Sequence, residues 1–104
     1  MSILTSKQRA HLRGLAHALK PIMHVGKEGV TPAATRALQQ VFDTHELVKV
    51  RVLEAAPEPA RETGHALAAG ISGAEVVQTV GRSVTLYRAD PETPAIQLPK
   101  PPAS

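Results

Sequence analysis

The chain has 104 residues and a mass of 11.0 kDa, a length that excludes a multidomain enzyme. With 42% hydrophobic and 20% charged residues, its composition is that of a folded protein rather than a disordered or collagen-like one. Its charge is unevenly distributed. Residues 1–52 contain eight Lys or Arg and three Asp or Glu, for a net charge of +5, whereas residues 53–104 contain four and six, for −2. A basic first half in a small domain favours an acidic polymer or surface as the partner.

Several residue types are absent or rare, and this narrows the function further. The chain has no cysteine, which excludes a disulfide framework, a thiolate metal site and a cysteine nucleophile. Phe42 and Tyr87 are the only aromatic residues, so stacking of bases on an aromatic platform is disfavoured and a nucleic-acid backbone is the better target. There is no apolar run of a membrane span or a signal peptide, so we expect a cytoplasmic protein that does not bind membranes.

The first predicted element is a helix from residue 5 to Pro21. Thr5 and Gln8 fit a capping box at its start, and the ring of Pro21 would end it. Its apolar face is predicted to consist of Leu12, Leu15, Ala16 and Leu19, and a neighbouring basic face of Arg9, Arg13, His17 and Lys20. This helix therefore has a core side and a basic side.

Residues 22–25 are predicted to form a strand, which is followed by the loop Gly26-Lys27-Glu28-Gly29 and by a helix that starts at Thr31-Pro32 and ends near His45. Two glycines before a helix start are typical of phosphate binding, because a backbone can approach closely and the free N–H groups attract anions. KH domains clamp a nucleic-acid backbone with a Gly-x-x-Gly loop. A simple strand-to-helix turn has the same pattern, and Glu28 would repel a phosphate.

The next predicted elements are a strand over residues 47–53 and an alanine-rich helix that contains Thr63 and Leu67. The valines of the strand face one way, and Lys49 and Arg51 face the other.

The C-terminal part is predicted to form a hairpin of residues 75–80 and 83–88, joined by Gly81-Arg82, and then a proline-rich extended tail over residues 89–104. The order α-β-α-β-α-β-β predicts an α/β sandwich of two or three layers with a mixed four-stranded sheet. We expect one domain over residues 1–88, followed by the tail.

No arrangement of residues marks a catalytic centre. The chain has no P-loop, no Gly-x-Ser-x-Gly motif, no dinucleotide fingerprint and no histidine pair at i, i+4 spacing. We therefore expect neither an enzyme nor a small-molecule substrate, and no metal or other cofactor. A buried cluster of His24, His45 and a carboxylate would favour a small enzyme instead.

Five segments stand in a characteristic order: LTSKQRAHLRGLAH at residues 4–17, LKP at 19–21, VGKEGVT at 25–31, ELVKVR at 46–51 and VGRSVTLYR at 80–88. Together they resemble the CRM domain in its bacterial stand-alone, YhbY-type form, and the resemblance extends over about residues 4–98. Glu28 and the loop with Pro57 and Pro59 depart from the family pattern.

The resemblance implies a fold similar to the C-terminal domain of a bacterial translation initiation factor. It also implies an RNA-binding protein that contacts ribosomal RNA in precursors of the large ribosomal subunit. The implied RNA contacts are Gly26, Lys27 and Gly29, supported by Lys7, Arg9, Arg13 and Lys20. Our own interpretation of the strands adds Lys49, Arg51, Arg82 and Arg88 to this surface.

Our leading hypothesis is a monomeric, non-enzymatic module that binds the ribose-phosphate backbone of ribosomal RNA in the precursor of the 50S subunit. An alternative is a ribosome-associated adaptor that binds proteins through the third helix and the tail. The adaptor hypothesis predicts that deletion of residues 89–104 abolishes association while Lys27→Glu does not. The RNA hypothesis predicts the reverse.

Overall fold

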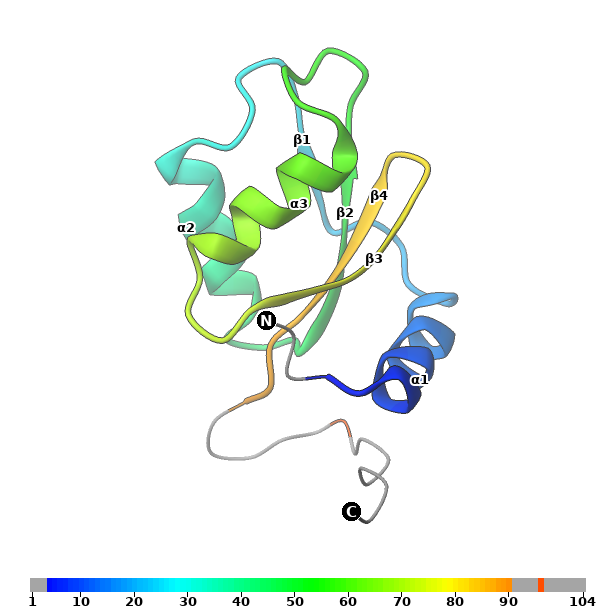
Figure 1. The fold of residues 1–104 in the computed structure, drawn as a ribbon. Coiled ribbons are helices and arrows are strands. Elements are labelled where there is room, and N and C mark those ends of the chain that lie inside the picture. Colours follow the sequence, from blue (N-terminus) through cyan, green and yellow to red (C-terminus); the bar gives the residue numbers. More distant parts are fainter. Residues whose placement is uncertain (1–3, 91–95, 97–104) are drawn as a thin grey trace.

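The computed structural model describes residues 4–90 and Ile96, and within them the chain forms three helices and four strands in the predicted order (Figure 1). The elements are α1 (Ser6–Ala16), β1 (Met23–Val25), α2 (Pro32–Val41), β2 (Leu47–Val52), α3 (Ala60–Ala69), β3 (Glu75–Val80) and β4 (Ser83–Tyr87). The predicted α/β class and element order are confirmed. Most of the predicted tail lies outside the described residues, so the division into a domain and a tail stays a prediction.

The four strands form one mixed sheet in the order β1-β2-β4-β3. β1 runs parallel to β2, and β4 runs antiparallel to both of its neighbours. The predicted hairpin between β3 and β4 turns at Gly81, whose φ of 55° lies in the left-handed region that glycine adopts without strain. A β-bulge between Val76 and Gln78 places Val77 on the same face as Gln78.

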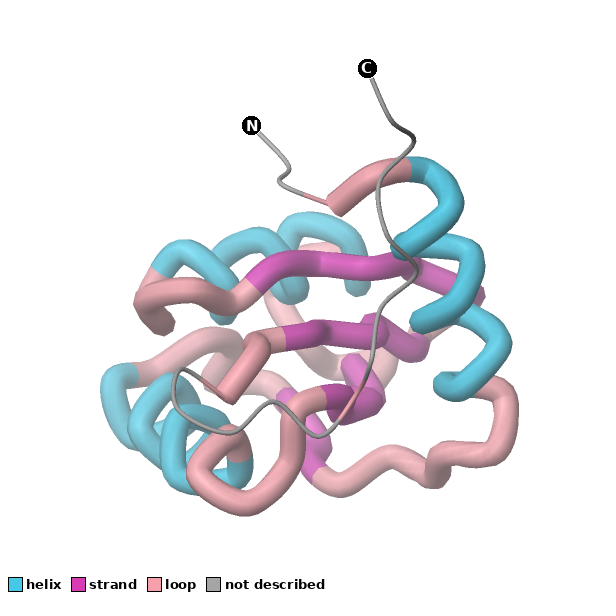
Figure 2. Tube along the Cα trace, turned by 90° about the horizontal axis from the view of Figure 1, so that it is seen from below, coloured by secondary structure: helices cyan, strands magenta, loops and turns pink. Residues whose placement is uncertain are grey.

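Helices cover both faces of the sheet, which makes a three-layer sandwich. α2 and α3 pack on the face that carries Val48, Val50 and Val52, and their buried residues form the main core. α1 packs on the opposite face, where Leu12 and Ala16 contact a smaller cluster around Leu47, Val77 and Tyr87. Figures 1 and 2 show the strands between α1 on one side and the other two helices on the other side.

Helix starts follow the sequence prediction closely. The Thr5 hydroxyl accepts a hydrogen bond from the Gln8 N–H at 3.1 Å, and the Gln8 side chain accepts one from the Thr5 N–H at 3.1 Å, which completes the capping box. At α2 the Thr31 hydroxyl accepts from the Ala34 N–H at 3.0 Å, and Pro32 occupies the first turn.

The end of α1 was predicted wrongly. The helix ends at Ala16 rather than at Pro21, and the chain then turns so that the Ile22 N–H donates to the Lys49 carbonyl at 2.9 Å. Before that bond the chain forms turns, in which the His17 N–H donates to the Gly14 carbonyl at 3.3 Å and the Leu19 N–H to the Ala16 carbonyl at 3.0 Å. Leu15, which was predicted to face the core, is 41% exposed.

The predicted end of α2 was also wrong, because it lay too far along the chain. This helix ends at Val41, several residues before His45, and Phe42 is its C-cap. The N–H groups of Asp43 and Thr44 donate to carbonyls three residues earlier, which tightens the final turn before β2 begins.

α3 sits directly against the sheet because it has a glycine at the contact. A Cβ on Gly64 would lie 2.5 Å from Cγ1 of Val84, so any side chain there would push the helix away from β4. Thr63 is 1% exposed, and its hydroxyl donates to the Glu58 carbonyl at 3.3 Å. The small residues of α3 therefore set its distance from the core.

Candidate functional site

The sheet face beneath α1 carries a set of basic and polar side chains. In β2, Lys49 and Arg51 alternate with the buried valines and point to this face, as predicted. Lys49 pairs with Thr85 of β4, which in turn pairs with Gln78 of β3, so these three residues form a row across the sheet. The neighbouring row consists of His24, Arg51, Ser83 and Val80.

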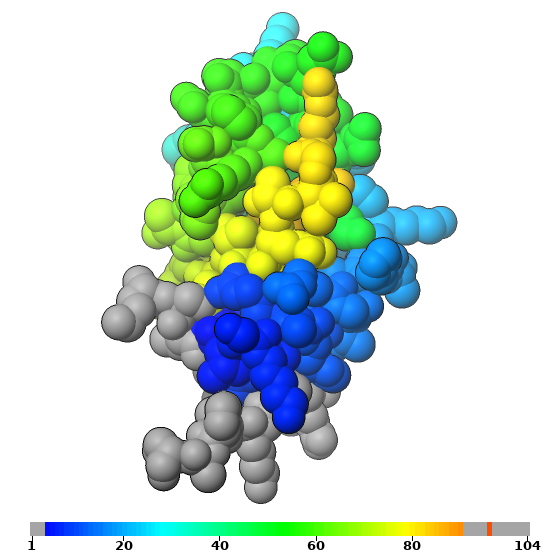
Figure 3. All heavy atoms as spheres, turned by 45° about the vertical axis from the view of Figure 1, so that its right-hand side comes forward, coloured from blue at the N-terminus to red at the C-terminus, as the bar shows by residue number. Residues whose placement is uncertain are grey.

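A cleft of about 450 Å³ lies between the second half of α1 and these two rows. Figure 3 shows this side of the molecule, with α1 in blue below the yellow strand β3 and its hairpin. The lining residues are Arg13, Gly14, His17, Lys49, Gln78, Val80, Ser83 and Thr85, and none of them is acidic. Sequence reasoning named Arg13 and Lys49 as site residues but missed Gln78, Ser83 and Thr85, although strand alternation puts Ser83 and Thr85 on one face.

A second hollow of about 300 Å³ brings Lys20 beside Lys49. The fold thus gathers Arg13, Lys20, Lys49 and Arg51 on one side of the molecule, and we call these four residues the α1-face cations. Within the described part of the chain, none of the four forms an ion pair. Their positive charge therefore remains available to an anionic partner.

The glycine loop lies at the end of β1, where the Gly29 N–H donates to the Gly26 carbonyl at 2.9 Å. Gly29 has a φ of 66°, and a Cβ on it would lie 2.9 Å from Cγ of Pro57. At Gly26 a Cβ would be in ordinary contact, 3.7 Å from Cδ1 of Leu53. The fold itself therefore requires glycine at position 29, whereas position 26 has room for a side chain.

The end of β2 separates the glycine loop from the β3–β4 hairpin. Leu53 donates its N–H to the Val25 carbonyl at 2.8 Å, and Val52 donates its own to the Arg82 carbonyl at 2.7 Å. Lys27 is exposed at this edge of the sheet. Lys27 and Arg82 therefore lie at the same end of the sheet, on either side of β2.

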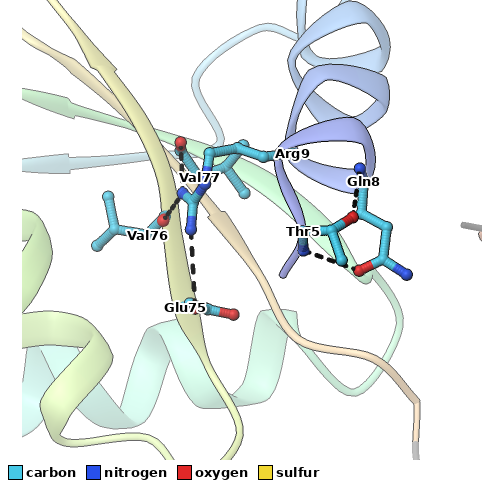
Figure 4. A network of polar contacts seen from close by, with 6 residues as sticks. All are labelled: Thr5, Gln8, Arg9, Glu75, Val76 and Val77. Carbon is cyan, nitrogen blue, oxygen red and sulfur yellow. Dashed lines mark hydrogen bonds and ion pairs between the residues drawn. The ribbon is translucent and has the colours of Figure 1, made fainter. Parts of the chain in front are cut away.

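Arg9 was predicted to contact RNA, and the structure gives its side chain an internal role. Its Nη1 donates to the carbonyls of Val76 and Val77 at 2.7 and 2.8 Å, and its Nη2 lies 3.8 Å from Oε1 of Glu75 (Figure 4). These carbonyls lie at the β-bulge of β3, an edge strand, and Arg9 donates a hydrogen bond to each of them. Arg9 thereby fastens α1 to β3, and its contact with RNA stays a prediction.

The other predicted basic residues are dispersed. Arg82 forms an exposed ion pair with Glu54 at 3.7 Å. Arg88 lies at the far end of β4, where its side chain is beside Gly73 and its N–H donates to the Glu46 carbonyl at 2.9 Å. Lys7 is exposed in the first turn of α1. The structure does not bring these three residues into the cleft.

Glu46 has a structural role that the sequence did not reveal. It is 8% exposed, and its two carboxylate oxygens accept hydrogen bonds from the N–H groups of Asp90 and Ile96, both at 2.6 Å. Burial raises the pKa of the Tyr87 hydroxyl, and the nearby Glu46 carboxylate raises this pKa further. Glu46 therefore holds described residues of the predicted tail against the domain.

Both aromatic side chains are buried, with Phe42 5% and Tyr87 6% exposed, so neither offers a platform for bases. His24 and His45 are exposed, and the buried histidine cluster that would favour an enzyme is not formed. In residues 4–90 and Ile96 we find no group of three His, Asp or Glu side chains able to hold a metal ion. None of the described helices has the length and hydropathy to cross a membrane.

Comparison with known proteins agrees with this architecture. Residues 4–88 match the CRS1 / YhbY (CRM) domain model. The chain is 38% identical over 97 residues to the Probable RNA-binding protein YqeI of Bacillus subtilis, which covers 93% of this chain and 100% of that protein. It is 36% identical over 100 residues to an RNA-binding protein of Haemophilus influenzae, covering 96% and 99%.

The fold also matches a solved structure. The solution structure of a Staphylococcus aureus protein, described as a candidate RNA binding protein, aligns with a TM-score of 0.77 and 33% sequence identity, covering 93% of this chain and 100% of that one. The family model spans every element from α1 to β4. The chain therefore belongs to the CRS1 / YhbY (CRM) domain family.

Proposed function

We propose that this protein binds RNA without catalysing a reaction, and that it contacts the backbone of ribosomal RNA during assembly of the large ribosomal subunit. The observation that carries the proposal is the group of α1-face cations, Arg13, Lys20, Lys49 and Arg51, which have no ion-pair partner among the described residues. The phosphates of RNA would supply the negative charge that pairs with these cations, and their binding would release counterions from the RNA.

Recognition of the backbone rather than of bases follows from the side chains available. Because Phe42 and Tyr87 are buried, neither the phenyl nor the phenol ring offers a surface on which bases can stack. Gly26 leaves the glycine loop open to close approach, and Lys27 adds an exposed cation beside it. The names of the relatives in Bacillus and Haemophilus support RNA as the partner.

The resemblance to the YhbY-type CRM domain supports the ribosomal part of the proposal. We propose that the protein acts as a monomer in the cytoplasm, on precursors of the large subunit. Crosslinking in cells, followed by mapping of the bound RNA, tests it. We expect crosslinks to concentrate on large-subunit ribosomal RNA and to be lost when Arg13 and Lys49 are both replaced by Gln. Arg36→Gln is the matched control, because Arg36 is an exposed cation on α2, across the sheet.

Two results would contradict the proposal in different ways. Crosslinks spread evenly over all cellular RNAs would leave RNA binding in place and remove the link to large-subunit assembly. Association with the precursor particle that persists in the double variant without any RNA crosslink would favour the protein-binding adaptor.

A further inference from the structure

The cleft between α1 and the sheet differs from an ordinary exposed cationic surface in two ways. It is concave, and different kinds of side chain line its two sides. Arg13 comes from α1 and His17 is the C-cap of that helix, whereas Lys49, Ser83 and Thr85 come from β2 and β4. Its volume of about 450 Å³ falls in the range of about 300–1,000 Å³ that is typical of small-ligand sites. A space of this size suits one nucleotide, whereas a duplex is too wide to enter it.

Strand pairing orders the floor of the cleft, which carries polar side chains beside the apolar Val80. Thr85, only 2% exposed, lies between Lys49 and Gln78 in one row, so the half-buried Gln78 and Ser83 are the floor residues that offer polar groups to the cleft. Hydroxyl and amide groups both donate and accept hydrogen bonds, which is what a ribose 2′-hydroxyl requires. The cation on β2 therefore lies in the same row as groups suited to a sugar.

The α1 rim of the cleft is open at one position. A Cβ on Gly14 would meet no atom within 4 Å, and glycine in the interior of a helix disfavours that helix. Packing within the described chain therefore gives no reason for a glycine there. Because Gly14 has no side chain, an RNA strand can approach the backbone of α1 closely at this position.

We propose that this cleft is a nucleotide subsite that holds one unpaired nucleotide of an RNA strand, with its phosphate against Arg13 and Lys49 and its 2′-hydroxyl against Ser83 of β4 and Gln78 of β3. This inference rests on the proposed function, since it assumes RNA as the partner. It adds a preference for RNA over DNA and for single-stranded segments, which charge alone does not provide.

The test fills the floor of the cleft without changing any charge. Ser83→Leu places an apolar side chain in the floor, and Ser83→Val does the same with a residue that favours strands. Ser72→Leu is the matched control, because Ser72 is exposed in the loop before β3, at the opposite end of β4 from Ser83. Thermal unfolding of each variant shows whether it is folded.

The binding probe is a fluorescein-labelled oligouridylate of about 12 nucleotides, compared with its 2′-deoxy counterpart by fluorescence anisotropy. We expect the unmodified protein to bind the RNA more tightly than the DNA. Ser83→Leu should weaken RNA binding about tenfold or more and bring the RNA-to-DNA affinity ratio close to one, while Ser72→Leu leaves both unchanged.

Other outcomes separate this inference from the function on which it rests. If folded Ser83→Leu and Ser83→Val bind RNA as tightly as the unmodified protein, while replacement of Arg13 and Lys49 by Gln weakens binding, the nucleotide subsite is wrong and RNA binding stands. Equal affinity of the unmodified protein for RNA and DNA also overturns the subsite. If the unmodified protein binds neither probe but binds ribosomal RNA, the subsite is wrong and the proposed function stands. If it binds neither the probes nor ribosomal RNA, the proposed function fails as well.

Discussion

Gly29 and Pro57 lie so close that a Cβ on Gly29 would be 2.9 Å from Cγ of the proline. The contact joins the glycine loop to the loop between β2 and α3, which are 28 residues apart in the sequence. From the sequence, Gly29 was predicted to serve RNA binding, and the Pro57 loop was an unexplained departure from the family pattern. The structure makes them one packed unit.

This relationship predicts opposite effects of two similar substitutions. Gly29→Ala should lower the free energy of unfolding by about 1–3 kcal/mol, because alanine is strained at a φ of 66° and its Cβ would press on Pro57. Gly26→Ala should leave it unchanged or raise it by up to about 1 kcal/mol, because its Cβ has room and the unfolded chain loses freedom. Urea unfolding measures both, and equal destabilisation would contradict the assigned roles.

Arg9 and Arg13 form a second matched pair, one turn apart on α1. Arg9→Ala should lower the free energy of unfolding by about 1–3 kcal/mol, because two carbonyls of β3 lose a charged donor. Arg13→Ala should change it by less than about 0.5 kcal/mol, because Arg13 is exposed and forms no described ion pair. RNA affinity, measured where both variants are folded, should fall more for Arg13→Ala. The reverse order would place Arg9 in the interface.

Tyr87 gives the domain a predictable weakness at alkaline pH. Its pKa in the folded protein is raised above the ordinary value of 10.0, so near and above that pH the unfolded chain loses the phenolic proton more readily than the folded one. The stability contributed by the neutral hydroxyl is complete below pH 10.0 and is lost as the pH rises through the folded pKa. Stability should therefore fall in this range.

Urea unfolding between about pH 8 and 11 tests this prediction against Tyr87→Phe, which has no titrating group at the site. Lysines titrate in both proteins, so the difference between the two curves isolates Tyr87. The difference should shift in favour of Tyr87→Phe as the pH rises. A difference that is constant with pH would show that Tyr87 titrates alike in the folded and unfolded states.

The sequence was sufficient where local chemistry decides the structure. Thr5 with Gln8, Thr31 with Pro32, and the alternation around Lys49 and Arg51 specify helix starts and a strand face on their own. Helix ends were less predictable. α1 ends at Ala16, before Pro21, and the Ile22 N–H then bonds to the Lys49 carbonyl of β2, a tertiary contact that no local pattern encodes.

The basic residues of the candidate site could be predicted from the sequence, but the cleft between them could not. Lys49 and Arg13 could be selected as basic residues on amphipathic elements, but their meeting across a cleft depends on how α1 lies on the sheet. Arg9 has the same charge and lies on the same helix, yet the bulge in β3 gives it a structural partner. Side-chain type alone could not separate these two roles.

The most direct test of the central claim, that unpaired cations bind an RNA backbone, is the dependence of RNA affinity on salt. For about five phosphate contacts, the logarithm of the association constant should fall with the logarithm of salt concentration with a slope of roughly −3.5 to −4.5. Lys49→Gln should reduce the steepness by about 0.7–0.9, the share of one phosphate, while Arg36→Gln leaves it unchanged. An affinity for ribosomal RNA that does not change with salt would contradict the account.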